Sequence, residues 1–176
     1  MSLLLDHMAK RRVTIAFFLV SVLIPFVCAT LIGDTYWDEL RAGDTAFIKS
    51  DFAIAEKHYR QALANADSDA NRSTALHYLG VSLLPQDKLV DAEDTYKREI
   101  ESAERAYGPG HPRMMESLSD ITLLYMRLGR WSDAQKYNQR ALTIAGHVSR
   151  EENKAGIELT ETLRDVIESK TPLQSK

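Results

Sequence analysis

The stretch that decides the fold is residues 80–99, GVSLLPQDKLVDAEDTYKRE, because its spacing recurs on both sides. Gly80 is followed by Ala92, then by Tyr96, and then by Glu99, at steps of 12, 4 and 3 residues. The same steps join Gly43, Ala55, Tyr59 and Ala62, and again Thr122, Ala134, Asn138 and Ala141. The three alanines at the middle of the pattern are 37 and 42 residues apart, and self-similarity at such a period predicts a repeat architecture.

Each unit is predicted to be a pair of antiparallel helices. A small residue on the first helix would let the alanine of the second approach closely, and the aromatic residue would fill the space toward the next pair. Apolar periodicity and boundary residues predict helices at about 35–48, 52–65, 71–84, 88–106, 112–128, 131–147 and 150–169.

Several boundary signals support these ranges. We expect Asn71 to cap the third helix, Pro85 to end it, Pro112 to occupy a first helical position and Gly129 to stop a helix. In the last helix, the spacing of Leu159, Leu163, Val166 and Ile167 predicts an apolar stripe that caps the stack. Residues 170–176 should form a flexible tail.

This pattern resembles the tetratricopeptide repeat, a helix–turn–helix unit with a small residue early, alanine in the middle and an aromatic residue then alanine in the second helix. The third unit is also similar to the longer repeat of kinesin light chains, through Tyr107-Gly108-Pro109-Gly110-His111-Pro112, Gly129-Arg130-Trp131 and Asp133-Ala134-Gln135. Glu99 and Asn138 depart from the pattern. The resemblance covers residues 36–148 and implies an all-α solenoid of about three repeats with a capping helix, over residues 35–169.

The N-terminal part of the chain differs in composition from the repeat region. After a short basic segment, residues 1–12, residues 13–32 contain no charge and are long enough, at about 30 Å as a helix, to cross a bilayer. This length favours a retained transmembrane signal anchor. A signal peptide is the alternative, since Lys10-Arg11-Arg12 supplies a basic start and Val27-Cys28-Ala29 a small-residue cleavage site.

Flanking charge predicts the orientation of this segment. Residues 1–32 have a net charge of +2. Because the whole chain has a net charge of −3, residues 33–176 have a net charge of −5. The positive-inside rule therefore puts the N-terminus in the cytoplasm and the repeat domain outside it. If the segment is cleaved near Ala29, the protein is instead periplasmic or secreted.

Chemistry other than binding has little support in the sequence. The acidic repeat domain argues against nucleic acid as a partner, and a single cysteine excludes an intramolecular disulfide. His58, His77, His111 and His147 share no metal-binding spacing, and Gly108-Pro109-Gly110 lacks the end of a phosphate-binding loop. The sequence therefore predicts a non-enzymatic protein with no cofactor, no metal and no small-molecule substrate.

Binding of a protein or peptide is the function that the resemblance implies. In this repeat class the first helices of successive pairs line a concave groove. The groove positions expected here are Trp37, Leu40, Asp44, Phe47 and Ile48, then Thr74, His77, Val81 and Leu84, then Glu116, Ser119, Leu123, Met126 and Arg127. Packing between helices is the alternative explanation for any of these positions, and for Leu40 and Leu123 especially. The lysine and asparagine with which such repeats grip a C-terminal carboxylate are missing from these positions.

Two hypotheses of function remain. The leading one is an interaction module that is tethered to a membrane and presents its groove to a partner protein or peptide. The alternative is a cleaved, soluble periplasmic or secreted repeat protein that assists assembly or secretion of envelope components.

Overall fold

The computed structural model describes residues 35–149, 151 and 153–170, and these residues form helices and turns without a strand. The chain is helical over residues 35–48 and then forms six further α-helices and one short 3₁₀ helix. Their bounds are α2 Phe52–Ala64, α3 Asp69–Leu83, η1 Leu84–Gln86, α4 Leu89–Tyr107, α5 Met114–Arg127, α6 Trp131–Ala145 and α7 Lys154–Lys170. The all-helical solenoid expected from the sequence is confirmed for this part of the chain.

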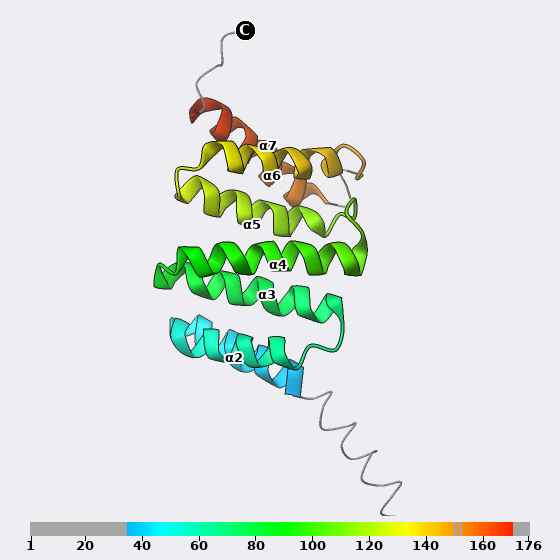
Figure 1. Ribbon diagram of the computed structural model, residues 1–176. Coiled ribbons are helices and arrows are strands. Elements are labelled where there is room, and N and C mark those ends of the chain that lie inside the picture. The colour runs from blue at the N-terminus through cyan, green and yellow to red at the C-terminus, as the bar shows by residue number, and fades with distance from the viewer. Residues whose placement is uncertain (1–34, 150, 152, 171–176) are drawn as a thin grey trace, which may run out of the picture.

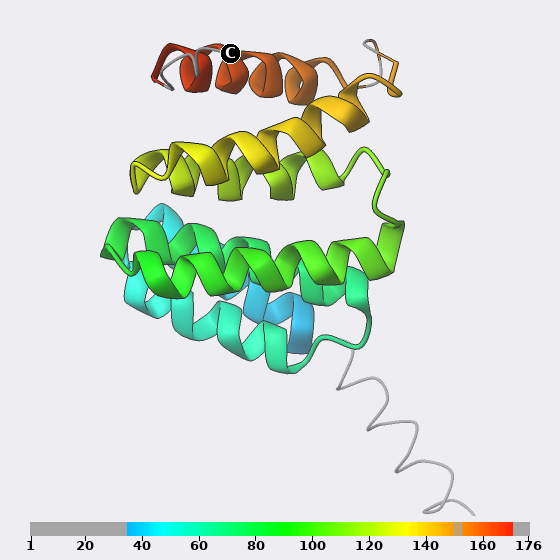
Figure 2. The ribbon, with the colours of Figure 1, turned by 45° about the horizontal axis from the view of Figure 1, so that its top comes forward.

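The helices stack in pairs along one direction, from residues 35–48 and α2 at one end to α7 at the other (Figure 1). Helix α3 packs against α2 and α4, α5 packs against α4 and α6, and α7 packs against both α5 and α6. Figure 2 shows that α4 and α6 lie on the near side of the stack, with α3 and α5 behind them. The core therefore runs between the two layers rather than at a single centre.

The glycine at the start of each repeat pattern makes room for the tyrosine of its own pair. A Cβ atom on Gly43 would lie 2.4 Å from Cε1 of Tyr59, and the corresponding distance from Gly80 to Tyr96 is 2.5 Å. The sequence-based expectation that the small residue accommodates the alanine is thus refined, because the larger ring is what fills the space. In the third unit Thr122 and Asn138 take these two places and both are buried, so a larger first residue is matched by a smaller second one.

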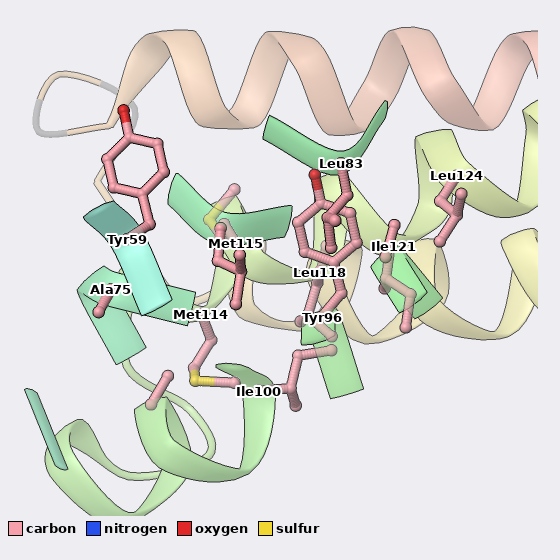
Figure 3. Packing of buried hydrophobic residues seen from close by; sticks show 14 of the residues in the cluster. Tyr59, Ala75, Leu83, Tyr96, Ile100, Met114, Met115, Leu118, Ile121 and Leu124 are labelled. Carbon is pink, nitrogen blue, oxygen red and sulfur yellow. The ribbon is translucent and has the colours of Figure 1, made fainter. Parts of the chain in front are cut away.

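The alanines of the pattern are fully buried, as expected for positions where helices cross: Ala55, Ala92 and Ala134 have no exposed surface. Around them, buried side chains from α2, α3, α4 and α5 form the continuous core of which Figure 3 draws a part. The ring of Tyr59 also stacks on Tyr78 of the next pair, at 5.5 Å between centroids. The tyrosine therefore joins its own unit to its neighbour.

The turn inside each helix pair repeats the same backbone geometry. Ser50, Asp87 and Gly129 all have a positive φ, of 63°, 58° and 68°. In each turn, this residue's N–H bonds to the carbonyl three residues earlier, and the next N–H bonds to the carbonyl five residues earlier. That pair of bonds is a Schellman motif, which ends a helix at a left-handed residue. Gly129 is the expected stop signal, while Ser50 and Asp87 fill the same role without the freedom of glycine.

Most helix boundaries differ from those expected by one to four residues. Ser68, not Asn71, caps α3, because its side chain accepts the hydrogen bond from the Asn71 N–H. Pro112 lies in a turn before α5, which begins at Met114. Helix α6 begins at Trp131 and ends at Ala145, two residues before the expected end. The end of α3 at Leu83, followed by η1 with Pro85 in its first turn, agrees with the sequence.

The capping helix α7 presents a different face from the one expected. Its buried residues are Ile157, Thr160, Leu163 and Ile167, whereas Leu159 and Val166 are exposed. Both stripes are compatible with helical periodicity, and packing against α5 and α6 selects the first. The cap is confirmed, but half of its predicted contact residues are wrong. Lys170, placed in the flexible tail by the sequence, is the last residue of the helix.

The N-terminal predictions concern residues outside those that the structure describes. These are the basic segment 1–12 and the membrane segment 13–32, and the tail residues 171–176 lie outside as well. Within the described residues, no helix combines the length and apolar character needed to cross a bilayer.

Candidate functional site

The residues predicted to line the groove lie on three first helices: residues 35–48, α3 and α5. The structure brings the groove positions of α3 and α5 together. Thr74, His77 and Glu116 border one cavity of about 160 Å³, which is also lined by Ser73, Tyr78, Glu99, Ala103, Tyr107, Arg113 and Ser117. The groove predicted from sequence therefore has a definite hollow between the second and third units.

A second cavity continues from the first. Its volume is about 430 Å³, and Glu116 and Arg113 border both. Ser119 and Met115 of α5 line it on one side, and Leu159 near the start of α7 lines it on the other. Leu159 is exposed here instead of packing in the cap, so the residue that sequence reasoning assigned to the core is available to a ligand.

The groove positions of residues 35–48 border neither cavity. Trp37 is half exposed with its ring edge-on to Tyr36, and Ile48 is 83% exposed. Phe47 is partly buried against Phe52, and Asp44 accepts a hydrogen bond of 2.8 Å from the Tyr59 hydroxyl. Leu40 is buried in the core. This end of the predicted groove thus offers separate apolar contacts rather than a hollow.

Other predicted positions take part in contacts between units. Arg127 donates to the carbonyl of Leu84 at 3.0 Å and to Asp87 Oδ1 at 2.9 Å, which joins α5 to the turn after α3. Met126 and Leu84 are partly buried against the core, and Val81 is half-buried. Leu123 is exposed.

The polar centre of the groove is a cluster of one histidine and three carboxylates. His77 Nδ1 lies 2.9 Å from Asp120 Oδ2 and 3.7 Å from Glu99 Oε1, and His77 Nε2 lies 3.8 Å from Glu116 Oε1. Glu99 comes from α4 and is only 2% exposed. Its Oε1 accepts a hydrogen bond of 2.7 Å from the Ser117 hydroxyl.

These neighbours change the protonation of the cluster. Burial lowers the pKa of His77, but the facing carboxylates of Asp120, Glu99 and Glu116 outweigh burial and raise it above its ordinary value. Burial raises the pKa of Glu99, although His77 and the Ser117 hydroxyl act in the opposite direction. Both shifts favour the proton-bound form, so the cluster holds its protons tightly.

Sequence reasoning identified two members of this cluster, His77 and Glu116, and missed Glu99 and Asp120. Spacing along the sequence reveals side chains that meet on one helix, such as residues three or four apart. These side chains come from three helices, α3, α4 and α5, so no such spacing connects them. One signal was available. Glu99 stands where the repeat pattern has a small alanine, and a carboxylate at a position that the fold buries calls for a polar partner.

The comparisons with known proteins agree with this architecture. The family model of the tetratricopeptide repeat matches residues 71–146. Residues 71–146 form tetratricopeptide repeats. A similar solved structure is the TPR2B-domain:pHsp70 complex of yeast Sti1, at 15% sequence identity and a TM-score of 0.64, with 78% of this chain and 98% of that chain covered. No curated protein matches the sequence.

Tetratricopeptide repeats indicate a protein–protein interaction module, because stacked helix pairs create an extended binding surface. The likeness to the yeast domain concerns the fold of the repeats. The matched residues 71–146 contain α4, α5 and α6 and all but the first two residues of α3. They include every residue that lines the first cavity.

Proposed function

We propose that the protein is a non-enzymatic scaffold, tethered to a membrane through residues 13–32, whose tetratricopeptide groove binds a partner protein or peptide outside the cytoplasm. The observation that carries the binding proposal is the cavity between α3, α4 and α5. Three side chains chosen from sequence as groove residues, Thr74, His77 and Glu116, border it together.

The chemistry of the groove favours a particular kind of peptide. Glu99 and Glu116 border the first cavity and Asp120 adjoins it through His77, while Arg113 is held beside the ring of Tyr107 at 5.3 Å. The groove positions also lack the lysine and asparagine with which such repeats grip a free C-terminal carboxylate. Exposed Trp37, Ile48 and Leu123 on the first helices offer apolar contact instead. The partner is therefore a peptide segment with apolar side chains, bound along its length.

The test of the groove uses two residues of equal exposure. Ile48 and Val90 are both 83% exposed, but Ile48 is a predicted groove residue and Val90 lies on α4. The full-length chain with Trp37→Ala and Ile48→Ala should lose a partner that the unsubstituted chain captures in crosslinking, and the chain with Val90→Ala should retain it. Equal capture by both variants, with helical circular dichroism unchanged, would contradict binding through this groove.

The tether is supported by the uncharged length of residues 13–32 and by the basic residues before them. The small-residue site at Val27-Cys28-Ala29 supports the alternative, a cleaved and soluble protein that assists assembly or secretion of envelope components. The mass of the mature chain distinguishes the two. A retained anchor gives the full mass and membrane association that survives alkaline washing, whereas cleavage after Ala29 removes 29 residues.

A further inference from the structure

The buried cluster at the centre of the groove has the composition of a metal site. His77, Glu99 and Asp120 each direct one ligand atom to a common point, and these atoms all lie within 4.8 Å of one another. Imidazole nitrogen and carboxylate oxygen are ligands of Zn²⁺ and related divalent cations. The three residues come from three different helices, α3, α4 and α5, so the fold itself fixes their convergence.

The distances suit a cation of this size. A tetrahedral Zn²⁺ with bonds of about 2.0–2.2 Å holds its donor atoms about 3.3–3.6 Å apart. His77 Nδ1 lies 2.9 Å from Asp120 Oδ2 and 3.7 Å from Glu99 Oε1, and all three donor atoms lie within 4.8 Å of one another. The two distances from His77 lie on either side of the spacing that the ion needs.

The donor atoms are buried and only partly satisfied. Among the described residues, Glu99 Oε2 is a buried atom with no hydrogen-bond partner, and His77 Nδ1 and Asp120 Oδ2 are buried atoms that face each other at 2.9 Å without hydrogen-bond geometry. Glu99 is 2% exposed, and leaving a buried carboxylate oxygen without a partner is unfavourable. A cation bound between the three residues would take the place of the proton that His77 and Asp120 share and would supply a partner for the Glu99 carboxylate.

The surroundings of the three residues resemble the outer shell of a metal site. Ser117 donates a hydrogen bond of 2.7 Å to Glu99 Oε1, and a hydrogen bond to a ligating carboxylate orients it. The second ring nitrogen of His77, Nε2, lies 3.8 Å from the Glu116 carboxylate, which is an ion-pair contact and not a hydrogen bond. The cavity of about 160 Å³ that His77 and Glu99 border provides an entry path.

We propose that His77, Glu99 and Asp120 bind a divalent transition-metal cation of the Zn²⁺ class within the groove. Three protein ligands leave a fourth position for water or for a group of a bound peptide. The site requires only the fold of the repeats, so it is independent of the identity of the partner and of the membrane segment.

The experiment is calorimetric titration of the full-length chain, without a histidine tag, in detergent and after treatment with a chelator, using ZnCl₂ as the probe. We expect one Zn²⁺ to bind per chain. The variants His77→Gln, Glu99→Gln and Asp120→Asn should each weaken the affinity at least tenfold. His58→Gln is the matched control and should leave the affinity unchanged. His58 is not part of the cluster, and its Nδ1 lies 2.7 Å from Oε2 of Glu39.

Two results would overturn the proposal: no binding of Zn²⁺ by the unsubstituted chain, or equal affinity in the chain with His77→Gln. Histidine ring signals in nuclear magnetic resonance supply a second measurement, in which binding is observed in the unsubstituted chain. Added Zn²⁺ should shift the signal of His77, identified by its absence from His77→Gln, and leave that of His58 in place. A shift of His58 alone would show adventitious surface binding and would contradict the site.

Discussion

The ring of Tyr96 occupies the space that a side chain at Gly80 would need, since a Cβ atom there would lie 2.5 Å from Tyr96 Cε1. Tyr96 is almost fully buried, so its ring is packed by neighbouring side chains on the other sides as well. Gly80→Ala should therefore lower the free energy of unfolding by about 1–2 kcal/mol, because the cost of overpacking exceeds the gain in helix propensity. Chemical denaturation measures the change.

The control for this substitution is Gly110→Ala, since no atom lies within 4 Å of a Cβ at that position. Its effect on unfolding should be close to zero. An unchanged or raised stability of Gly80→Ala would mean that the two helices separate easily, and would contradict the close approach within the pair.

The repeated turn geometry predicts a stabilising change. Ser50 has a φ of 63° at the position where the third turn has Gly129. Ser50→Gly should relieve the unfavourable contact of Cβ with the backbone and raise the free energy of unfolding by about 0.5–1 kcal/mol, while Gly129→Ser should lower it by a similar amount. Lys49→Gly, one residue earlier and without a positive φ, should give no gain, and a gain equal to that of Ser50→Gly would refute this explanation.

The buried alanines predict a cost for larger side chains. Ala92 and Ala134 have no exposed surface, so Ala92→Leu and Ala134→Leu should each lower the free energy of unfolding by about 1–3 kcal/mol. Ala53→Leu on the exposed face of α2 is the control and should change little. Thermal unfolding of the three variants checks the prediction, which fails if all three share one midpoint.

The capping helix offers two neighbouring residues with opposite roles. Ile167 is buried and Val166 is exposed. Ile167→Ala should cost about 2–5 kcal/mol of stability because it leaves a cavity against the preceding helices, whereas Val166→Ala should cost well under 1 kcal/mol. If Val166→Ala loses more stability than Ile167→Ala in denaturation experiments, the buried face of α7 is the one expected from the sequence.

The repeat domain should fold without the N-terminal segment. The described apolar faces pack against neighbouring helices from residues 35–48 to α7, so a chain of residues 33–176 should remain soluble and almost entirely helical. Circular dichroism with strong strand content, or an unfolded chain, would disagree with this expectation.

Much of the fold was predictable from the sequence because repeats are local. The steps from Gly80 to Ala92 and Tyr96 describe one helix pair, and their recurrence at Gly43 and Thr122 describes how the pairs stack. Gly129 as a stop and Pro85 as a helix end also depend only on neighbouring backbone atoms, and both predictions are confirmed. The predicted cap of α3 was wrong because Asn71 and Ser68 are both good capping residues, and the helix begins at Asp69, directly after Ser68.

The tertiary structure alone decided which residues meet across helices. The buried face of α7 includes Ile157 rather than Leu159, since periodicity permits either stripe and only the surfaces of α5 and α6 distinguish them. His77, Glu99 and Asp120 are 22 and 21 residues apart in the chain, so no spacing rule connects them. They converge because α3, α4 and α5 pack against one another in order along the stack. Contacts between helices depend on how whole repeat units pack, and the local order of residues does not determine them.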